Sequence, residues 1–346
     1  MGSGWPSVVS DEEQLEDLLS APSPEVVAAL GELKGDLLIL GVGGKIGPSL
    51  ARMAKRASDA AGMARRIMGV ALFESDRARA DLEQHGIESI HGDLLDRAFL
   101  ESLPDVPNVL FLAGMKFGSV ENLPLTWAIN CYLPGLVAER YRQSRIVAFS
   151  TGCVYPLVPI ASGGSRETDP PQPVGEYAQS CLGRERMFQY ASRTHGTPVT
   201  LIRLNYAVEM RYGVLVDIAQ KVFAGEPVDL RMGHVNVIWQ GDVNAMVLRS
   251  LLLCQSPANI LNVTGPEIVS VRWLAEQFGA LFGREPRFLN QESDTALLSN
   301  AARAFGLFGY PQVPLEVLIR WTADWIANGR PLLQKPTHFE VRNGKF

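Results

Sequence analysis

Short apolar runs alternate with amphipathic segments along the first two thirds of the chain. The first run, residues 37–40, is wholly apolar, which is typical of a strand buried on both faces of a parallel sheet. Further strands are predicted at 68–73, 89–91, 109–113, 145–150 and 199–204. Helices are predicted between them at 46–60, 76–85, 125–142 and 177–194. This alternation predicts an α/β fold with a Rossmann-type, doubly wound parallel sheet.

The two ends of the chain follow other patterns. Before the first strand, Ser10 and Glu13 have the spacing of a capping box, and Pro24 has the position of a first helical residue, so two short helices are expected. After residue 204 the elements are mixed: helices are predicted at 214–224, 271–282 and 315–327, and strands at 235–239 and 260–263. We therefore expect an N-terminal helical extension (1–36), a Rossmann domain (37–205) and a smaller C-terminal α/β lobe (206–346). The lobe is interleaved with the domain, because 235–262 is predicted to return to the Rossmann sheet.

A glycine-rich turn directly follows the first strand and opens the next helix. It contains Gly41, Gly43, Gly44 and Gly47. Glycines allow the tight turn, let the backbone approach a pyrophosphate and let helix and strand pack closely, while the helix N-terminus attracts the anion. The strand–turn–helix context therefore predicts dinucleotide binding, with Lys45 and Ile46 inside the turn.

The residues after the second strand bear on the choice between NAD and NADP. An acid at this place bonds the ribose hydroxyls of NAD, and a nearby Arg accommodates the 2′-phosphate of NADP. Glu74 or Asp76 is a candidate for the first role and Arg77 for the second, and all three are equally compatible with solvated loop charges. We expect NAD or NADP, with NAD slightly favoured.

Composition and charge narrow the class of protein. The chain has 346 residues, 47% hydrophobic residues and a net charge of −5, and no basic run, so no nucleic-acid partner is expected. No apolar run approaches the ~20 residues of a membrane span, and no signal-peptide pattern begins the sequence, so a cytoplasmic protein without a membrane partner is expected. The four cysteines lack metal-ligand spacing, and reduced thiols without a metal site are expected.

Several further motifs keep a fixed order along the chain. They are Gly92-Asp93-Leu94, Phe111-Leu-Ala113-Gly114-Met-Lys116, Asn130, Phe149-Ser-Thr151-Gly-Cys-Val-Tyr155, Tyr177 and Trp239-Gln-Gly-Asp242-Val243. Together with the glycine turn, they make the sequence resemble the extended short-chain dehydrogenase/reductase superfamily, specifically the NAD-dependent epimerase/dehydratase family, from about residue 37 to 328.

The resemblance implies roles for these residues. Asp93 and Leu94 follow the third strand, where the family contacts adenine. Ala113, Gly114 and Lys116 correspond to the segment that passes under the cofactor, and Asn130 to a residue that organises the site. Tyr177 is implied as the acid/base, which also contacts the cofactor, and Thr151 as the hydroxyl that orients the substrate oxygen. The family also implies a sugar or sugar-like substrate bound mainly by the C-terminal lobe, and a homodimer formed through helices 125–142 and 177–194.

The catalytic motif departs from the family at one position. A Lys one helical turn after the Tyr lowers the pKa of the Tyr in the family, but Cys181 stands here. Arg184 lies on the same helical face, where it is either a substitute cation or, as is more usual for Arg, a surface charge. Lys116 is a second possible substitute. No adjacent His supports Cys181 as a nucleophile.

The C-terminal lobe also departs from the family's nucleotide-sugar enzymes. Val235 stands near the place of their phosphate-gripping Arg, and the segment from Arg203 to Glu209 is one residue short of their pattern. Both changes weaken a nucleotide-sugar assignment, and a smaller sugar, a sugar acid or another hydroxylated carbonyl compound fits equally well. The candidate substrate contacts are Asn205, Arg211, Tyr212, His234 and Asn236; each is equally compatible with a loop residue that has no role.

Three hypotheses follow from these observations. The first is an NAD(P)-dependent epimerase, dehydratase or oxidoreductase. The second is a catalytically weakened dinucleotide-binding sensor or scaffold, which the loss of the Lys favours and the retention of Thr151 and Tyr177 opposes. The third is a non-redox isomerase or lyase on the same fold.

Overall fold

The computed structural model describes residues 4–73, 75–116, 118–119 and 121–345, so the predicted ribose contact Glu74 lies outside the described residues. Its centre is a seven-stranded sheet in the order β12-β7-β5-β4-β1-β2-β3, in which every neighbouring pair is parallel. The strands are β1 (Leu37–Leu40), β2 (Ile67–Ala71), β3 (Glu88–His91), β4 (Asn108–Phe111), β5 (Arg145–Thr151), β7 (Val199–Leu204) and β12 (Asn259–Val263). The predicted doubly wound fold is confirmed.

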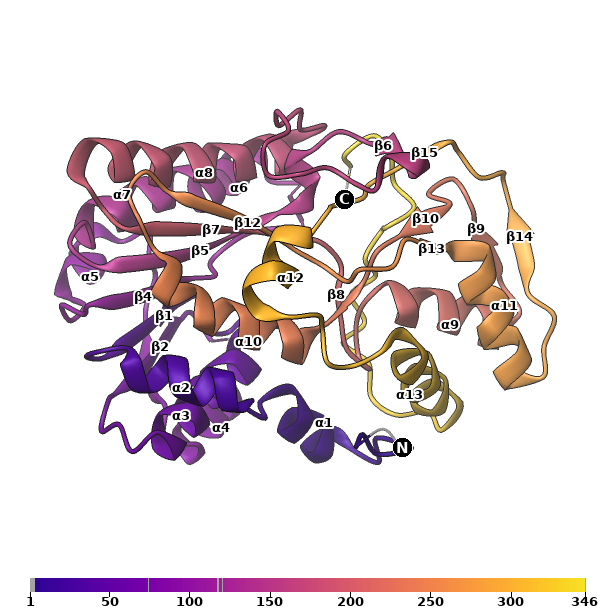
Figure 1. Cartoon of the computed structure of the whole chain (residues 1–346), viewed down its shortest axis with the longest axis horizontal. Coiled ribbons are helices and arrows are strands. Elements are labelled where there is room, and N and C mark those ends of the chain that lie inside the picture. Colours follow the sequence, from indigo (N-terminus) through magenta and orange to yellow (C-terminus); the bar gives the residue numbers. More distant parts are fainter. Residues whose placement is uncertain (1–3, 74, 117, 120, 346) are drawn as a thin grey trace.

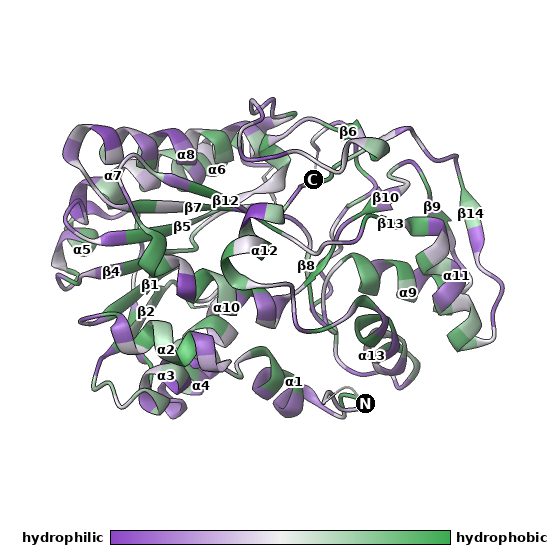
Figure 2. Cartoon of the chain, in the orientation of Figure 1, coloured by the Kyte–Doolittle hydropathy of each residue, from purple (hydrophilic) through white to green (hydrophobic). Residues whose placement is uncertain are grey.

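Helices cover both faces of this sheet (Figure 1). One face carries α5 (Arg97–Ser102), α6 (Leu123–Trp127), α7 (Leu133–Arg140) and α8 (Glu176–His195). The other carries α2 (Pro24–Glu32), α3 (Gly47–Ala60), α4 (Asp76–Gln84) and α10 (Gln240–Ser250). The middle residues of the inner strands are apolar, as Figure 2 shows, because both faces of these strands are buried.

The helix predicted at 125–142 is interrupted by a π-helical turn. Residues Ala128–Tyr132 form this turn between α6 and α7, and the turn packs against α8. Pro134 follows it and has no backbone N–H, so the carbonyl of Asn130, four residues earlier, lacks its usual helical donor. The Asn130 carbonyl is thus available to a donor from outside this helix.

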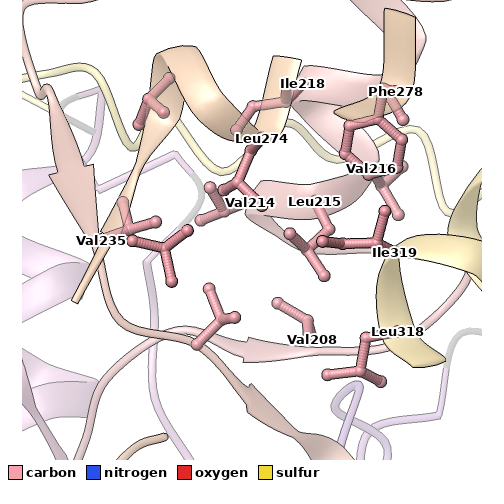
Figure 3. Packing of buried hydrophobic residues seen from close by; sticks show 14 of the residues in the cluster. Val208, Val214, Leu215, Val216, Ile218, Val235, Leu274, Phe278, Leu318 and Ile319 are labelled. Carbon is pink, nitrogen blue, oxygen red and sulfur yellow. The ribbon is translucent and has the colours of Figure 1, made fainter. Parts of the chain in front are cut away.

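The C-terminal lobe has its own hydrophobic core. Three helices enclose it: α9 (Val214–Ala224), α11 (Val271–Phe282) and α13 (Leu315–Ala327). Figure 3 shows their buried faces meeting, with Leu215, Ile218, Leu274, Phe278 and Ile319 in one cluster. The smaller elements are β6 (Val158–Pro159), β8 (Ala207–Val208), β9 (Pro227–Asp229), β10 (His234–Val235), β11 (Ile238–Trp239), β13 (Val269–Ser270), β14 (Arg287–Leu289), β15 (Thr295–Ala296) and α12 (Ala302–Phe308).

The strand predicted at 235–239 consists of two short pieces. β10 pairs with β13, and β11 pairs with β8, so neither pairs with the central sheet. β12, which follows them, does pair with β7. The two pieces are separated at Asn236. Its buried side chain forms hydrogen bonds with Asn205 and Ser299, so residues 235–239 do not continue as one strand.

The two N-terminal helices pack against α3 and α10, which cover one face of the sheet. The cap of α1 (Glu12–Leu19) is Asp11 rather than the predicted Ser10: its side chain accepts from Gln14 N, and the Gln14 side chain accepts from Ser10 N. The start of α2 is as predicted, with Ser23 as the cap and Pro24 as the first residue. Contacts of α1 with α3 and α10 bring its inner face beside the glycine turn.

Residues 328–345, here called the C-terminal strap, contain no helix or strand and return between the two lobes (yellow in Figure 1). Leu333 N donates to Arg211 O, and the Arg342 guanidinium donates to Thr295 O and Oγ1. Phe339 is buried in the core of the lobe. The strap is therefore tied to the lobe at several points.

In the described part of the chain, no helix is long and apolar enough to cross a membrane.

Candidate active site

The order of the strands reverses between β1 and β4, and the glycine turn lies at that point. Gly41 has a φ of +88°, and a Cβ there would lie 2.5 Å from Ala113 N, so only glycine allows β1 and β4 to end side by side. The turn leads into the N-terminus of α3. A cleft of about 570 Å³ opens here. Ligands of doubly wound sheets bind at this switch point, and helix N-termini bind phosphate there.

Most of the predicted cofactor contacts line this cleft. They are Gly41, Gly43, Gly44, Lys45, Ile46, Gly47, Gly114, Lys116 and Tyr177. Asp93 is exposed after β3, and its carboxylate accepts from Leu95 N, while Leu94 is buried beside it. Ala113 and Asn130 lie behind the lining residues, where Ala113 contacts the glycine turn and Asn130 supports the loop after β4.

Arg184 lies inside this site, and the prediction of a surface charge is wrong. Only 5% of Arg184 is exposed, and it lines the cleft. Its guanidinium donates to Asn130 Oδ1 at 2.7 Å, to Phe149 O at 2.8 Å and to the Asn130 carbonyl at 3.4 Å. The last acceptor is the carbonyl that Pro134 cannot satisfy. The π-helical turn and Pro134 thus create a place for a buried cation, which the helical spacing from Tyr177 alone did not establish.

A second, smaller cavity of about 150 Å³ adjoins the cleft. We call it the inner cavity. Thr151 at the end of β5 and Tyr177 in the first turn of α8 both line it. Its other polar lining residues are Lys45, Lys116, Ser150, Cys153, Asn205, Tyr206, Tyr212, Gln240 and Thr337. The fold therefore brings the two predicted catalytic hydroxyls together beside the glycine turn.

Tyr177, which lines the inner cavity, packs against the buried Cys181. Burial and the neighbouring Cys181 and Cys153 thiols raise the pKa of Tyr177 well above its ordinary value, whereas the Arg184 charge acts to lower it. Burial also raises the pKa of Cys181 to about 11, although the nearby Arg184 charge and a hydrogen bond from Tyr177 act against this. The Tyr177 hydroxyl is thus a proton donor to a neutral thiol, and Cys181 is no ready nucleophile.

Two lysines face the inner cavity from different elements. Lys116 comes from the loop after β4 and donates to Thr337 O at 3.1 Å, and burial lowers its pKa. Lys45 comes from the glycine turn, with its amino group 2.8 Å from the centre of the Tyr212 ring. Burial, followed by the Lys116 charge, lowers the pKa of Lys45 to about 6. The sequence placed Lys45 in the turn but carried no signal that it lines the same cavity as Thr151 and Tyr177.

Some of the predicted substrate contacts line the cleft or the inner cavity, and others lie outside both. Asn205 lines the inner cavity, but its amide donates to Asn236 Oδ1 and Leu297 O. Arg211 lines the cleft and forms ion pairs with Glu209, Glu12 and Glu16. Asn236 is buried and joins Asn205 to Ser299, and His234 lies in β10. Neither of these last two lines the cleft or the inner cavity.

The sheet is doubly wound, the glycine turn lies at its switch point, and the N-terminus of α3 faces the cleft. This is the architecture of a dinucleotide-binding protein. The sequence model of the NAD dependent epimerase/dehydratase family matches residues 37–208. Residues 37–208 therefore belong to this family, as the resemblance predicted for this part of the chain.

Solved structures with a similar fold include three complexes with NAD. MoeE5 in complex with UDP-glucose and NAD has a TM-score of 0.69 and 19% identity, over 85% of this chain and 99% of that one. UDP-glucose 4-epimerase of Thermus thermophilus in complex with NAD has a TM-score of 0.68 and 22% identity, over 84% and 98%. The dTDP-glucose 4,6-dehydratase of Bacillus anthracis str. Ames in complex with NAD has a TM-score of 0.71 and 16% identity, over 85% and 97%. No curated protein matches the sequence.

Proposed function

We propose that the protein is an NAD(P)-dependent epimerase, dehydratase or oxidoreductase that acts on a hydroxyl or carbonyl group of a sugar or sugar-like compound. The observation that carries this proposal is the convergence of Thr151 and Tyr177 on one cavity that adjoins the glycine-turn cleft. Two separate elements, β5 and α8, supply the two hydroxyls at the point where a nicotinamide dinucleotide of this fold would end.

The cleft fits such a cofactor. Gly43 and Gly44 are exposed in it, and the backbone of the turn and the N-terminus of α3 would hold the pyrophosphate. Bound NAD or NADP would supply hydride transfer. The family's solved relatives contain NAD, which favours NAD here, and titration calorimetry with NAD, NADH, NADP and NADPH would decide between the two cofactors.

Tyr177 is the proposed acid/base. Its raised pKa keeps the hydroxyl protonated in the free protein, so it is ready to donate a proton to a carbonyl oxygen. Thr151 orients that oxygen from the other side of the cavity. Removal of a proton from an alcohol requires a lower pKa, and Arg184 is the nearby positive charge that acts in this direction. We propose that Arg184, together with Lys116, replaces the Lys that is absent at position 181.

The proposal is tested with Tyr177→Phe on a panel of sugars, sugar acids and nucleotide sugars. Nicotinamide reduction measures oxidoreductase activity, and chromatography of the products measures epimerisation and dehydration, which cause no net reduction of the cofactor. Loss of a general acid/base is expected to lower kcat about 10²–10⁴-fold. The dissociation constant of the cofactor is expected to change less than twofold. Tyr190→Phe is the matched control, because Tyr190 is on the same helix and 64% exposed. Full activity of Tyr177→Phe would contradict the catalytic assignment.

A catalytically weakened dinucleotide-binding protein is the second candidate, and the hydrogen bond from Tyr177 to Cys181 favours it. That bond points the hydroxyl at a thiol instead of a cation. The second candidate predicts cofactor binding without turnover of any compound of the panel, and Tyr177→Phe would then leave every measured property unchanged.

We further propose a homodimer. A groove over the π-helical turn, α7 and α8 is lined by Trp127, Tyr132 and Tyr190, which are exposed by 36%, 50% and 64%. Large exposed aromatic side chains that gather on one face are typical of protein interfaces. Sedimentation equilibrium of the protein, with Tyr190→Glu as the variant, tests this arrangement; a monomer at all concentrations would contradict it.

A further inference from the structure

The C-terminal strap joins the lobe to the Rossmann domain beside the glycine-turn cleft. On the side of the lobe, Thr337 N and Oγ1 donate to Asp217 Oδ2 at 2.8 and 2.5 Å. Leu333 N donates to Arg211 O at 3.1 Å. On the side of the Rossmann domain, Thr337 O accepts from Lys116 at 3.1 Å. Thr337 is thus bonded both to α9 and to the loop after β4.

The end of the strap also packs against the start of the catalytic helix. A Cβ on Gly344 would collide with Val174 O, and one on Gly175 would collide with Gly344 O. Tyr177 follows Gly175 by two residues. The strap therefore contacts segments of both lobes that surround the site.

Firm anchors lie on either side of residues 332–338, here called the lid segment. Before it, Pro331 O accepts from Trp325 Nε1 of α13 at 2.9 Å. After it, Phe339 is 1% exposed in the core of the lobe. Between these anchors the lid segment contains no helix or strand, and its middle residues 334–336 are exposed. It can therefore move without unfolding the core of the lobe.

Two residues of the lid segment have a strained backbone. Gln334 and His338 have φ angles of +52° and +54°, in the left-handed region that is unfavourable for residues with a Cβ. The hydrogen-bonded residues Leu333 and Thr337 are their direct neighbours in the sequence. Strain of this kind persists only where surrounding contacts hold it. The observed conformation of the lid segment thus depends on a few hydrogen bonds.

The lid segment shares the proposed cofactor site. Leu333 and Lys335 line the same cleft as Gly43 and Gly44 of the glycine turn. Thr337 lines the inner cavity, which adjoins this cleft. A dinucleotide in the cleft would therefore lie against the lid segment as well as against the glycine turn.

We propose that the lid segment covers the bound dinucleotide and opens for its exchange. The hydrogen bonds of Leu333 and Thr337 hold the closed conformation. Entry and release of the cofactor both pass through the open conformation, so the strength of these bonds sets both rates. The inference rests on the cofactor of the proposed function, but not on the reaction that the protein catalyses.

Stopped-flow fluorescence of NADH or NADPH, whichever binds more tightly to the full chain, tests the proposal. Thr337→Val removes the Oγ1 bond to Asp217 and keeps the shape of the side chain. Loss of this one bond is expected to raise the association and dissociation rate constants of the cofactor about three- to tenfold. Thr264→Val is the matched control, because Thr264 Oγ1 also donates one buried hydrogen bond, to Asn236 O, and Thr264 lines neither cavity. Its rate constants should stay within about twofold of those of the unmodified protein.

Hydrogen exchange of the unmodified protein gives a second readout that depends on no variant. Without cofactor, the amides of the lid segment should exchange faster than those of α13. Saturating cofactor should slow exchange of the lid segment at least about tenfold, because a ligand that contacts the closed conformation increases its population. Mass spectrometry of peptides from residues 332–338 and 315–327 measures both, and thermal unfolding shows whether each variant is folded.

Three results would overturn the inference. The first is equal rate constants for Thr337→Val and Thr264→Val. The second is a rise of the dissociation rate constant alone, which would make Thr337 a contact of the cofactor and not a bond of the lid. The third is exchange of the lid segment that cofactor leaves unchanged.

The failure of this inference differs from the failure of the proposed function. Cofactor binding that leaves the lid segment unaffected would overturn the inference alone. The expected rate and exchange effects without turnover of any substrate would leave the inference standing and contradict the proposed activity. No binding of NAD, NADH, NADP or NADPH would overturn both.

Discussion

Asn130 Oδ1 accepts two hydrogen bonds, one from the Arg184 guanidinium at 2.7 Å and one from Met115 N at 2.9 Å. One amide oxygen thus joins the buried cation of α8 to the loop that follows β4. The Asn130 amide nitrogen completes the link by donating to Met115 O and Ser180 Oγ. The Asn130 side chain consequently positions both the loop after β4 and the Arg184 guanidinium.

Arg184→Met should damage both stability and catalysis. The variant leaves Phe149 O and the Asn130 carbonyl without the buried donor, and an unsatisfied buried group costs about 1–3 kcal/mol of unfolding free energy. It also removes the charge that lowers the pKa of Tyr177, so the acidic, rising limb of the kcat/KM profile for alcohol oxidation should move to higher pH, because Tyr177 must be deprotonated to act as the base. Urea unfolding and a pH–rate profile measure the two effects; an unchanged profile would contradict the assigned role of Arg184.

Cys181 should resist alkylation in the folded protein. It is 1% exposed and its pKa is raised to about 11 by burial, so little thiolate is present at pH 8. Mass spectrometry after treatment with iodoacetamide is expected to find Cys181 modified at least a hundredfold more slowly than in urea-unfolded protein. Rapid modification of the native protein would show that Cys181 is an activated nucleophile after all.

Glu185→Ala should unfold the protein at a much lower urea concentration. Glu185 and Arg203 form a buried ion pair with hydrogen bonds of 2.7 and 2.9 Å, and Ser150 Oγ adds a third bond to the carboxylate at 2.6 Å. Removing one partner leaves a buried charge and is expected to cost about 3–5 kcal/mol.

Asp105→Ala is the matched control for this variant. It breaks the ion pair with Arg140, in which the Asp105 side chain is 91% exposed, and pairs of this kind contribute ~1 kcal/mol or less. Equal effects of the two variants would contradict the assignment of the Glu185–Arg203 pair as the stabilising one.

Asp242 should make stability depend on pH. Burial raises the pKa of Asp242 to about 6 from an ordinary 3.8, although its carboxylate accepts from Gln312 N and Val313 N. The folded state binds the proton of Asp242 more tightly than the unfolded state does, so protonation of Asp242 adds to the free energy of unfolding. This contribution is about 3 kcal/mol below pH 4 and is lost as the pH rises toward 6. Asp242→Asn is expected to abolish that part of the pH dependence. Urea unfolding at pH 4.5 and 7.5 compares Asp242→Asn with the unmodified protein. The same change of unfolding free energy with pH in both would contradict the prediction.

Much of the fold was predictable because its signals are local. β1 is four apolar residues followed by a glycine turn, and a strand buried on both faces needs no partner to be identified. The predicted limits of α9, α11 and α13 agree with the observed ones, since each amphipathic pattern ends at a Gly or follows a Pro. The helix at 125–142 was predicted without its π-helical turn, which depends on contacts with α8.

The candidate site was predictable only where a residue's role follows from its place in a motif. The glycine turn, Thr151 and Tyr177 are of this kind, because the turn joins β1 to α3, Thr151 ends β5 and Tyr177 lies in the first turn of α8. The surface position that is usual for Arg was wrong for Arg184, because its guanidinium is held inside the fold by the Asn130 side chain and the Phe149 carbonyl, which are distant in the sequence. His234 and Asn236 were proposed from their sequence neighbours and lie outside the lining of both cavities.

The sequence by itself determined the doubly wound sheet and the glycine turn, because apolar periodicity and turn chemistry act over a few residues. Thr151 and Tyr177 were identified as candidate catalytic hydroxyls through the family resemblance. Only the tertiary structure decided which cations face the site and how large its inner cavity is. Lys45, Lys116 and Thr337 come from the glycine turn, the loop after β4 and the C-terminal strap, and they meet through packing of the lobes. Side-chain direction and cavity size depend on such long-range contacts, which no local pattern in the chain encodes.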